Sequence, residues 1–270
     1  MSAAPGECVL DGRVMPVGEA RVPATDEGLL RGDGAFEVVR LYAGRPFALD
    51  DHMRRMARSA ETLMLETDLA AVREDALTAC ELADGRDLLL RLVITRGGHR
   101  VALLERMPGH GDTLRLSVEH HLPTPLLHAA KSLSYAANML AARRARERGY
   151  DDALLVTPSG QVLEVTRSSF FWVEDGRIYT PPLEDDTILD SITRRRVLEE
   201  NEVTERKVQL DALPGADETF SAGTSFEVLP VTEIEGVGSY EAGPVTREVC
   251  ERVRARVERE LAGADLDSAR

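Results

Sequence analysis

The sequence has few of the features that mark secreted, membrane-spanning or zinc-binding proteins. Its 270 residues contain three cysteines, Cys8, Cys80 and Cys250, which are odd in number and far apart. This argues against a disulfide framework or a zinc knuckle and favours the reducing cytoplasm. No apolar run approaches the roughly 20 residues that a membrane helix needs. The first residues, MSAAPGECVLDG, have no basic stretch before an apolar one, so we expect no signal peptide.

Positive charge is also scarce. The chain has 33 Lys and Arg against 47 Asp and Glu, a formal net charge of −14. Such a surface repels nucleic acid and anionic membranes, so we expect neither as a partner, although a local basic pocket is compatible with it. With 43% hydrophobic and 30% charged residues, the chain has the composition of a globular protein with a sizeable core.

Lysine is the rarest charged residue, because Lys131 and Lys207 are the only two and the other 31 basic residues (33 − 2) are arginines. An amine can lose its proton and attack a carbonyl, whereas a guanidinium stays charged. Lys131 lies in HAAKSLSYAANMLA, with no charged residue after it until Arg143. Burial there would lower the pKa of its ammonium group, as a Schiff-base lysine requires. The alternative is a solvated lysine at a strand end.

Apolar periodicity predicts a mixture of strands and helices. Strands are expected at 35–42, 88–95, 114–118, 153–156, 161–165 and 169–173. A helix is expected in DDHMRRMARSAETLML, around Asp51, with an apolar face of Met53, Met56, Ala57, Ala60, Leu63 and Met64. Further helices are expected at about 136–148, from near Asp190, and after Pro244, the last with an apolar stripe of Val245, Val249, Val253, Val257 and Leu261.

Two prolines at Pro123-Thr124-Pro125 exclude a helix or a central strand and predict an extended connector. We therefore expect a small N-terminal domain at 1–122, a linker at 123–127 and a larger C-terminal domain at 128–270. The fold class is α/β (α+β). A doubly wound dinucleotide-binding fold is not indicated, because Gly32-Asp33-Gly34 lacks the third glycine, and there is no Walker lysine motif.

Several other residues could bind a cofactor. Glu164 lies in a short apolar strand, where a carboxylate needs a cationic partner, unless it faces water at a sheet edge. The ring nitrogen of pyridoxal phosphate (PLP) is one such partner. Arg55, the helix start at 190–193 and the small-residue turn at 221–225 could together hold a phosphate, although each alone has an ordinary structural explanation.

The order of these motifs resembles that of the class IV (fold type IV) PLP-dependent transaminases. This family contains branched-chain and D-amino-acid aminotransferases and aminodeoxychorismate lyases. The matching stretches are RGDGAFEVVRL (31–41), DHMRRMA (51–57), LLLRLVITRG (88–97), KSLSYAANMLAA (131–142), GYDDALLVTPSGQVLEVTRSSFFWVEDGRIYTPPL (149–183), ILDSITRR (188–195) and ADETFSAGTSFEVLPVTEIEGV (216–237). They cover most of residues 11 to 250. The resemblance implies a two-domain fold with the cofactor between the domains, and a homodimer.

The resemblance also implies roles for individual residues. Lys131 matches the lysine that bonds the cofactor and carries the proton at the substrate Cα. Glu164 matches the carboxylate that binds the pyridinium nitrogen, and Arg55 matches the phosphate-binding arginine. Further cofactor contacts are implied for Ile192, Thr193, Thr224 and, with altered spacing, Tyr135.

Two further positions depart from the family pattern. Ser191 replaces the usual glycine, which predicts a slightly different backbone near the phosphate, and Arg31 replaces an aromatic residue near the substrate. Arg31, Arg96 and Arg100 are our candidates for substrate binding, because an arginine grips a carboxylate at two points. For Arg96 and Arg100, each taken alone, a solvated loop arginine is the stronger alternative.

The predicted activity is ping-pong transfer of an amino group between an amino acid, of D- or branched-chain type, and a 2-keto acid. Pyruvate elimination, as in the lyases, is the alternative within the family. A non-catalytic binding module is the alternative outside it, but binding alone does not require the lysine. A metal site is not expected, because the adjacent His120 and His121 point to opposite faces of a strand, and His52, His99, His110 and His128 form no ligand-spaced cluster.

Overall fold

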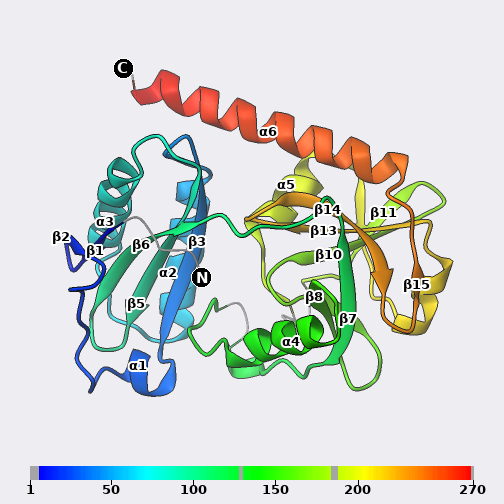
Figure 1. Cartoon of the computed structure of the whole chain (residues 1–270), viewed down its shortest axis with the longest axis horizontal. Helices are drawn as coiled ribbons and strands as arrows, with labels where there is room; N and C mark the ends of the chain where they lie inside the picture. The colour runs from blue at the N-terminus through cyan, green and yellow to red at the C-terminus, as the bar shows by residue number, and fades with distance from the viewer. Residues whose placement is uncertain (1–5, 128–129, 184–187, 269–270) are drawn as a thin grey trace. The chain divides into compact units, whose positions relative to one another are not determined.

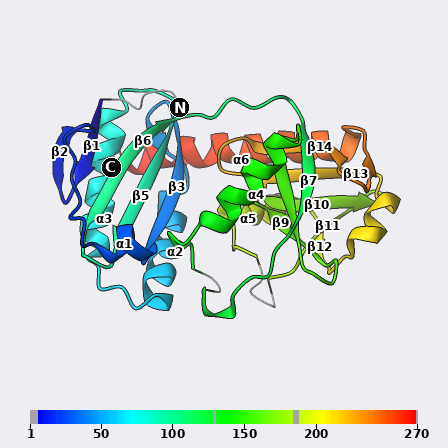
Figure 2. The same cartoon turned by 60° about the horizontal axis from the view of Figure 1, so that its bottom comes forward.

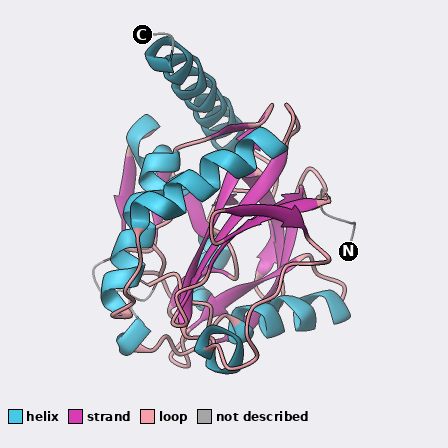
Figure 3. Cartoon of the chain, turned by 90° about the vertical axis from the view of Figure 1, so that its left-hand side faces the viewer, coloured by secondary structure: helices cyan, strands magenta, loops and turns pink. Residues whose placement is uncertain are grey.

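The chain forms two compact units that differ from the expected domain division. The computed structural model describes residues 6–127, 130–183 and 188–268. Unit 1 comprises Met1–Pro108, Ala129–Tyr135 and Gly263–Arg270, and unit 2 comprises Gly109–His128 and Ala136–Ala262. The expected boundary at 123–127 therefore lies inside unit 2. The class is mixed α/β, as expected (Figure 3).

Unit 1 is an antiparallel sheet with helices on one face. Its strands are β1 (Glu7–Leu10), β2 (Arg13–Pro16), β3 (Gly34–Tyr42), β4 (Arg45–Pro46), β5 (Leu88–Thr95) and β6 (Arg100–Arg106), in the order β2-β1-β6-β5-β3-β4. Its helices are α1 (Glu27–Arg31), α2 (Leu49–Thr62) and α3 (Leu69–Leu82). Helices α2 and α3 lie along the strands (Figures 1 and 2), and a single apolar core joins them to the sheet.

The strand and helix predictions for this unit are confirmed except at one helix end. On β3, Ala35, Val39 and Leu41 are fully buried, as period-two alternation requires. Met64 was expected on the apolar face of α2, and this was wrong. The helix ends at Thr62, and Met64 has a left-handed backbone (φ +50°) and is 80% exposed.

Unit 2 contains a larger mixed sheet. Its strands are β7 (Leu114–His120), β8 (Asp152–Val156), β9 (Val162–Val165), β10 (Ser169–Glu174), β11 (Arg177–Thr180), β12 (Val203–Glu205), β13 (Glu218–Gly223), β14 (Glu227–Ile234) and β15 (Gly238–Ser239). Their order is β12-β11-β10-β13-β14-β7-β8-β9, with β15 paired to β14. The helices are α4 (Ala136–Glu147), α5 (Ile192–Glu200) and the short 3₁₀ turns Pro125–Leu127 and Leu210–Gly215, together with α6 (Pro244–Ser268), whose residues up to Ala262 belong to unit 2.

Helices on unit 2 cover the sheet through small or branched apolar residues. Helix α4 packs on β8 and β7 (Figure 1) through Ala141 and Ala145. The predicted stripe of α6 is confirmed, because Val249 and Val253 are buried against Phe171 and Phe220 of the sheet. None of the described helices combines the length and apolar character that a bilayer crossing requires.

Two segments explain why the two units differ from the expected domains. Strand β7 precedes the two prolines, yet it pairs in parallel with β8 and β14 and so is part of the unit 2 sheet. The segment around Lys131 follows the prolines, yet it pairs with β3. Phe36 N donates to Lys131 O (2.9 Å), and Leu133 N donates to Gly34 O (2.9 Å). Backbone pairing with distant strands therefore decides the units, and the prolines do not.

Candidate active site

Lys131 is held by its backbone from two sides within unit 1. Its carbonyl oxygen accepts a hydrogen bond from Phe36 N of β3, and its N–H donates to Ser59 Oγ of α2 at 3.0 Å. Ser59 is completely buried, whereas the lysine is half-buried. Because the backbone of Lys131 is anchored at both its N–H and its carbonyl, the position of its Cα is fixed.

Two aromatic rings lie beside the lysine amine. Lys131 Nζ is 4.5 Å from the ring centroid of Phe36 and 5.5 Å from that of Tyr135. The two rings contact each other edge to face, with centroids 5.3 Å apart. Ring faces attract a cation, but they give the amine an apolar environment. Tyr135 is thus close to Lys131, although it stands four residues after it.

Arg55 lies in a buried cluster of polar side chains. Glu37 of β3 accepts two hydrogen bonds from the guanidinium, from Nε at 2.6 Å and from Nη2 at 2.7 Å, and a third contact from His52 Nδ1 at 2.7 Å. The exposed fractions are 0% for Glu37, 1% for His52 and 3% for Arg55. Arg55 is therefore not the solvated helix arginine that composition alone allowed.

The charge states in this cluster follow from its geometry. Burial works to raise the pKa of Glu37, but the charge of Arg55 and the hydrogen bonds from Arg55 and His52 outweigh it, so the pKa lies well below 4.5. Burial lowers the pKa of His52 below 6.5, and the charges of Arg55 and Lys131 add to this, although Glu37 opposes it. Glu37 is ionised and His52 is neutral at pH 7. Because a carboxylate only accepts, His52 carries its proton on Nδ1.

Glu164 lies on unit 2, in strand β9, between the buried residues Leu163 and Val165. Its carboxylate accepts a hydrogen bond from Leu189 N at 3.3 Å, so it is tied to the segment that leads into α5. The side chain is half-buried. A carboxylate in this position has lost part of its hydration and is suited to a cationic partner.

Helix α5 begins at Ile192, shortly after Leu189, whose backbone N–H donates to Glu164. The side chain of Ser191 caps the helix by accepting from Arg194 N at 3.4 Å. The first N–H groups of a helix have no intrahelical acceptor, and they attract anions. The negative charge of Asp190, just before the helix, is balanced by Arg195, whose Nε donates to it at 2.7 Å. This helix start, which includes Thr193, therefore suits a phosphate.

Ser191 does not disturb the backbone at this helix start. It has φ −75° and ψ 135°, an extended conformation that any residue adopts. A serine at position 191 therefore requires no change of backbone conformation relative to a glycine. The hydroxyl instead adds a helix cap that glycine would lack.

The turn that carries Thr224 requires a small residue beside it. A Cβ atom at Gly223 would lie 2.8 Å from Ser168 Cβ, so the strand end and its neighbour approach closely only with glycine there. Ser168 Oγ is in turn hydrogen-bonded to Ser221 Oγ at 2.7 Å. Thr224 itself is half-buried. The turn thus places a hydroxyl and backbone amides at the end of β13.

Comparison with known proteins identifies the family of this chain. The sequence pattern of the family described as "Amino-transferase class IV" matches residues 34–234. The chain belongs to the class IV aminotransferases. This class IV enzyme is 32% identical to the D-alanine aminotransferase of Bacillus licheniformis over 89% of its own chain and 93% of the relative. It is 30% identical to the aminodeoxychorismate lyase of Bacillus subtilis, over 84% and 86%.

A solved structure shares the fold. The branched-chain aminotransferase of Thermoproteus uzoniensis, determined with norvaline, superposes with a TM-score of 0.84 at 31% identity, covering 93% of this chain and 94% of that one. The fold-type-IV architecture is thereby confirmed, and so is the prediction of a PLP-dependent aminotransferase that acts on an amino acid and a keto acid. The donor sets described above fit PLP, because they offer an amine, a carboxylate, a guanidinium and a helix start.

The three candidate substrate-binding arginines of the aminotransferase already have carboxylate partners within unit 1. Arg31 pairs with Glu27 in the exposed helix α1. The other two pairs are Arg96 with Asp33 (2.9 Å) and Arg100 with Asp75 (2.9 Å). A substrate carboxylate would have to compete with these partners. A substrate role for the three arginines stays a prediction.

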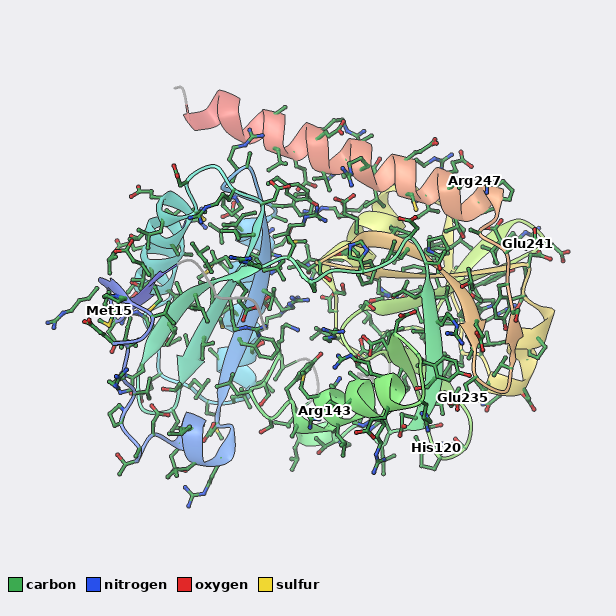
Figure 4. The ribbon with its side chains drawn as sticks, viewed as in Figure 1. Met15, His120, Arg143, Glu235, Glu241 and Arg247 are labelled. Carbon is green, nitrogen blue, oxygen red and sulfur yellow. The ribbon has the colours of Figure 1, made fainter. Side chains whose placement is uncertain are left out.

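Within the described residues, no group of three or more His, Cys, Asp or Glu side chains is arranged to hold a metal ion. His120, labelled in Figure 4, is exposed, with Nδ1 3.3 Å from Thr157 O, whereas His121 is half-buried. His128 lies outside the described residues.

Sequence reasoning missed Glu37, His52 and Ser59. Glu37 was noted only within a family motif, although it is the single charged residue on the buried face of β3. His52 and Ser59 stand three residues before and four after Arg55, so one face of α2 carries all three. A charged residue at a buried strand position, together with polar residues at helical spacing on a core-facing helix, is the signal that could have found them.

Proposed function

We propose that this aminotransferase moves the amino group of an amino acid with an uncharged side chain, of the D-alanine or branched-chain type, to a 2-keto acid. The observation that carries the proposal is Lys131, anchored on β3 and α2 with its amine beside the rings of Phe36 and Tyr135. These rings favour an apolar substrate side chain over a charged one. The donors named for the relatives, D-alanine and branched-chain amino acids, fit this environment.

Lys131 is the catalytic residue of the proposal. Its amine would hold the aldehyde carbon of the cofactor in the free enzyme. As a base, the same amine would accept the proton from the substrate Cα and hold it at Nζ. An amine can do this only while neutral, and the rings of Phe36 and Tyr135 give it an apolar environment that favours the neutral form.

The other residues bind and orient the cofactor. PLP supplies an electron sink, which works best while its ring nitrogen is protonated. Glu164 would hold that proton at the ring nitrogen through its carboxylate. Arg55 would bind the phosphate through its guanidinium, with the helix start at Ile192 and Thr193 and the hydroxyl of Thr224 as further donors. Tyr135, next to Lys131, would contact the cofactor ring or its phenolic oxygen.

We also propose that the enzyme is a homodimer in the reducing cytoplasm. The dimer is inferred from the family resemblance, and the location from three widely spaced cysteines that form no disulfide. Light scattering of the purified protein tests the dimer directly. A monomer at the concentration used in the activity assay would overturn this part of the proposal without affecting the chemistry.

The test of the activity is the visible spectrum of the PLP-loaded protein as D-alanine, L-leucine or L-glutamate is added in turn. We expect the absorption of the lysine-bound cofactor to disappear and that of the amine form to appear with D-alanine or L-leucine. The amino acid that responds identifies the donor. A spectrum that stays unchanged with all three would contradict transamination of these donors and favour pyruvate elimination.

The matched control is Lys131→Ala, which should retain cofactor through its phosphate contacts but show no lysine-bound absorption. A protein without that absorption before any substitution would contradict the role of Lys131 itself.

A further inference from the structure

We propose that Glu37 and His52 are positioning residues that fix the guanidinium of Arg55 for the cofactor phosphate. The inference rests on the proposed role of Arg55 and goes beyond it, because neither residue has an assigned part in binding or catalysis. Both act through Arg55.

The contact between Glu37 and Arg55 fixes a plane and a direction. The carboxylate accepts from Nε and from Nη2, so both of its oxygens engage one edge of the guanidinium. Two parallel hydrogen bonds between planar groups allow little rotation. His52 donates from Nδ1 to the same oxygen that accepts from Nη2, which prevents the carboxylate from turning about its own axis.

The surroundings make this contact rigid. Glu37 lies in the middle of β3, opposite Leu92 of β5, and its neighbours on that face of the strand, Ala35 and Val39, are fully buried. Arg55 and His52 come from adjacent turns of α2. A strand and a helix thus hold the cluster, and both are joined through the core of unit 1. An arginine on a loop would have no such support.

Charge explains why the cluster needs an ionised glutamate. A buried guanidinium without a counter-ion is strongly destabilising, so Arg55 could not be placed here alone. Within the described residues, the charged and titratable groups that act on the cluster include Glu37 from β3, His52 and Arg55 from α2, and Lys131, whose charge acts on His52. Glu37 balances one positive charge before any phosphate binds. The guanidinium is therefore in place in the free protein and needs no reorganisation on binding.

The position of the cluster separates a binding role from a purely structural one. The face of α2 that carries His52 and Arg55 also carries Ser59, which holds the backbone of Lys131. One helix face therefore orients both the lysine that bonds the cofactor and the arginine proposed for its phosphate. A displacement of the guanidinium should weaken phosphate recognition specifically.

The experiment compares PLP with pyridoxal, which has the same aldehyde but no phosphate. The dissociation constants of both are measured for the full-length protein by absorption titration, and their ratio gives the preference for the phosphate. We expect Glu37→Gln to reduce this preference on the order of tenfold, because a charged bidentate contact is replaced by a weaker one. Pyridoxal binding should change little.

Three further variants make the result interpretable. Glu218→Gln is the matched control, because it removes another buried carboxylate (5% exposed), in unit 2, and should leave the preference unchanged. His52→Phe keeps a ring but loses the hydrogen bond to Glu37, so a smaller fall of about threefold is expected. This variant also provides the test if Glu37→Gln does not fold. Arg55→Ala should reduce the preference further than Glu37→Gln does, while the helix start at Ile192 and the hydroxyl of Thr224 keep part of it.

The outcomes distinguish this inference from the proposal on which it rests. If Arg55→Ala reduces the phosphate preference while Glu37→Gln and His52→Phe leave it at the wild-type value, the positioning role is refuted and Arg55 keeps its own. Equal weakening of PLP and pyridoxal in Glu37→Gln would show a general structural role and would also overturn the inference. If Arg55→Ala retains the preference, the phosphate role of Arg55 fails, and positioning fails with it.

Discussion

Replacing Ser59 by alanine should displace the proposed catalytic lysine without touching it. The hydroxyl of Ser59 accepts the backbone N–H of Lys131 at 3.0 Å. Ser59→Ala removes that acceptor and leaves a small gap between α2 and the lysine segment. The hydrogen bond from Phe36 N to the carbonyl oxygen of Lys131 remains. We therefore expect the segment to stay on β3 but to move at its α2 side.

The size of the effect follows from burial. A buried N–H that loses its acceptor costs about 1–3 kcal/mol. Ser59 is 0% exposed but Lys131 is half-buried, so water can partly replace the hydroxyl, and we expect the lower part of this range, about 1–2 kcal/mol. At about 2–4 °C per kcal/mol for a chain of this size, Tm should fall by roughly 2–8 °C. Misplacement of the amine should also lower kcat, by about tenfold.

The assay combines thermal unfolding with single-turnover kinetics of the first half-reaction at saturating donor. The matched control is Thr180→Val, which removes a completely buried hydroxyl that donates to Phe170 O at 2.9 Å in unit 2. Thr180→Val should lower Tm comparably and leave the rate constant unchanged. A wild-type rate constant in Ser59→Ala, or an equal loss of rate in Thr180→Val, would refute the reasoning.

Three other predictions concern charge. Lys131→Ala should reduce the half-reaction below detection while dialysis still finds bound PLP, and turnover near the wild-type rate would contradict the assignment. The free energy of unfolding should fall as pH drops below 6.5, because the unfolded chain protonates His52 while the folded chain, with its lowered pKa, does not. Urea unfolding from about pH 8 to about pH 5 measures this dependence, and His52→Gln should flatten it. Glu218→Gln should destabilise the protein by about 1–2 kcal/mol in thermal unfolding, because the carboxylate of Glu218 accepts hydrogen bonds from Val245 N and Thr246 N at the start of α6. An unchanged Tm would show that this helix cap does not contribute to stability.

Much of the fold could be predicted from local patterns. Strand β5 lies at the predicted residues, and the stripe of α6 is buried as its four-residue spacing requires. Such patterns are readable because each residue's burial depends mainly on the period of its own element. The end of α2 was missed, since Met64 continues the apolar spacing but has a left-handed backbone.

The division of the chain into units could not be predicted in the same way. Whether β7 joins the sheet of unit 1 or that of unit 2 depends on the strands it pairs with, which are β8 and β14. Neither the prolines nor the apolar periodicity predicts that pairing. The same reason applies to the lysine segment, which follows the predicted linker but pairs with β3.

The sequence by itself determined the family and the cofactor, and it led to the proposal that Lys131 is the catalytic lysine. A chain with 31 arginines and two lysines, and an ordered set of motifs, needs no coordinates for those conclusions. Only the tertiary structure decided which side chains support Arg55 and Lys131. Glu37 is 18 residues from Arg55, and Ser59 is 72 residues from Lys131. The physical reason is that periodicity tells which residues are buried, whereas the partner of a buried polar group is set by the packing of a helix on a sheet.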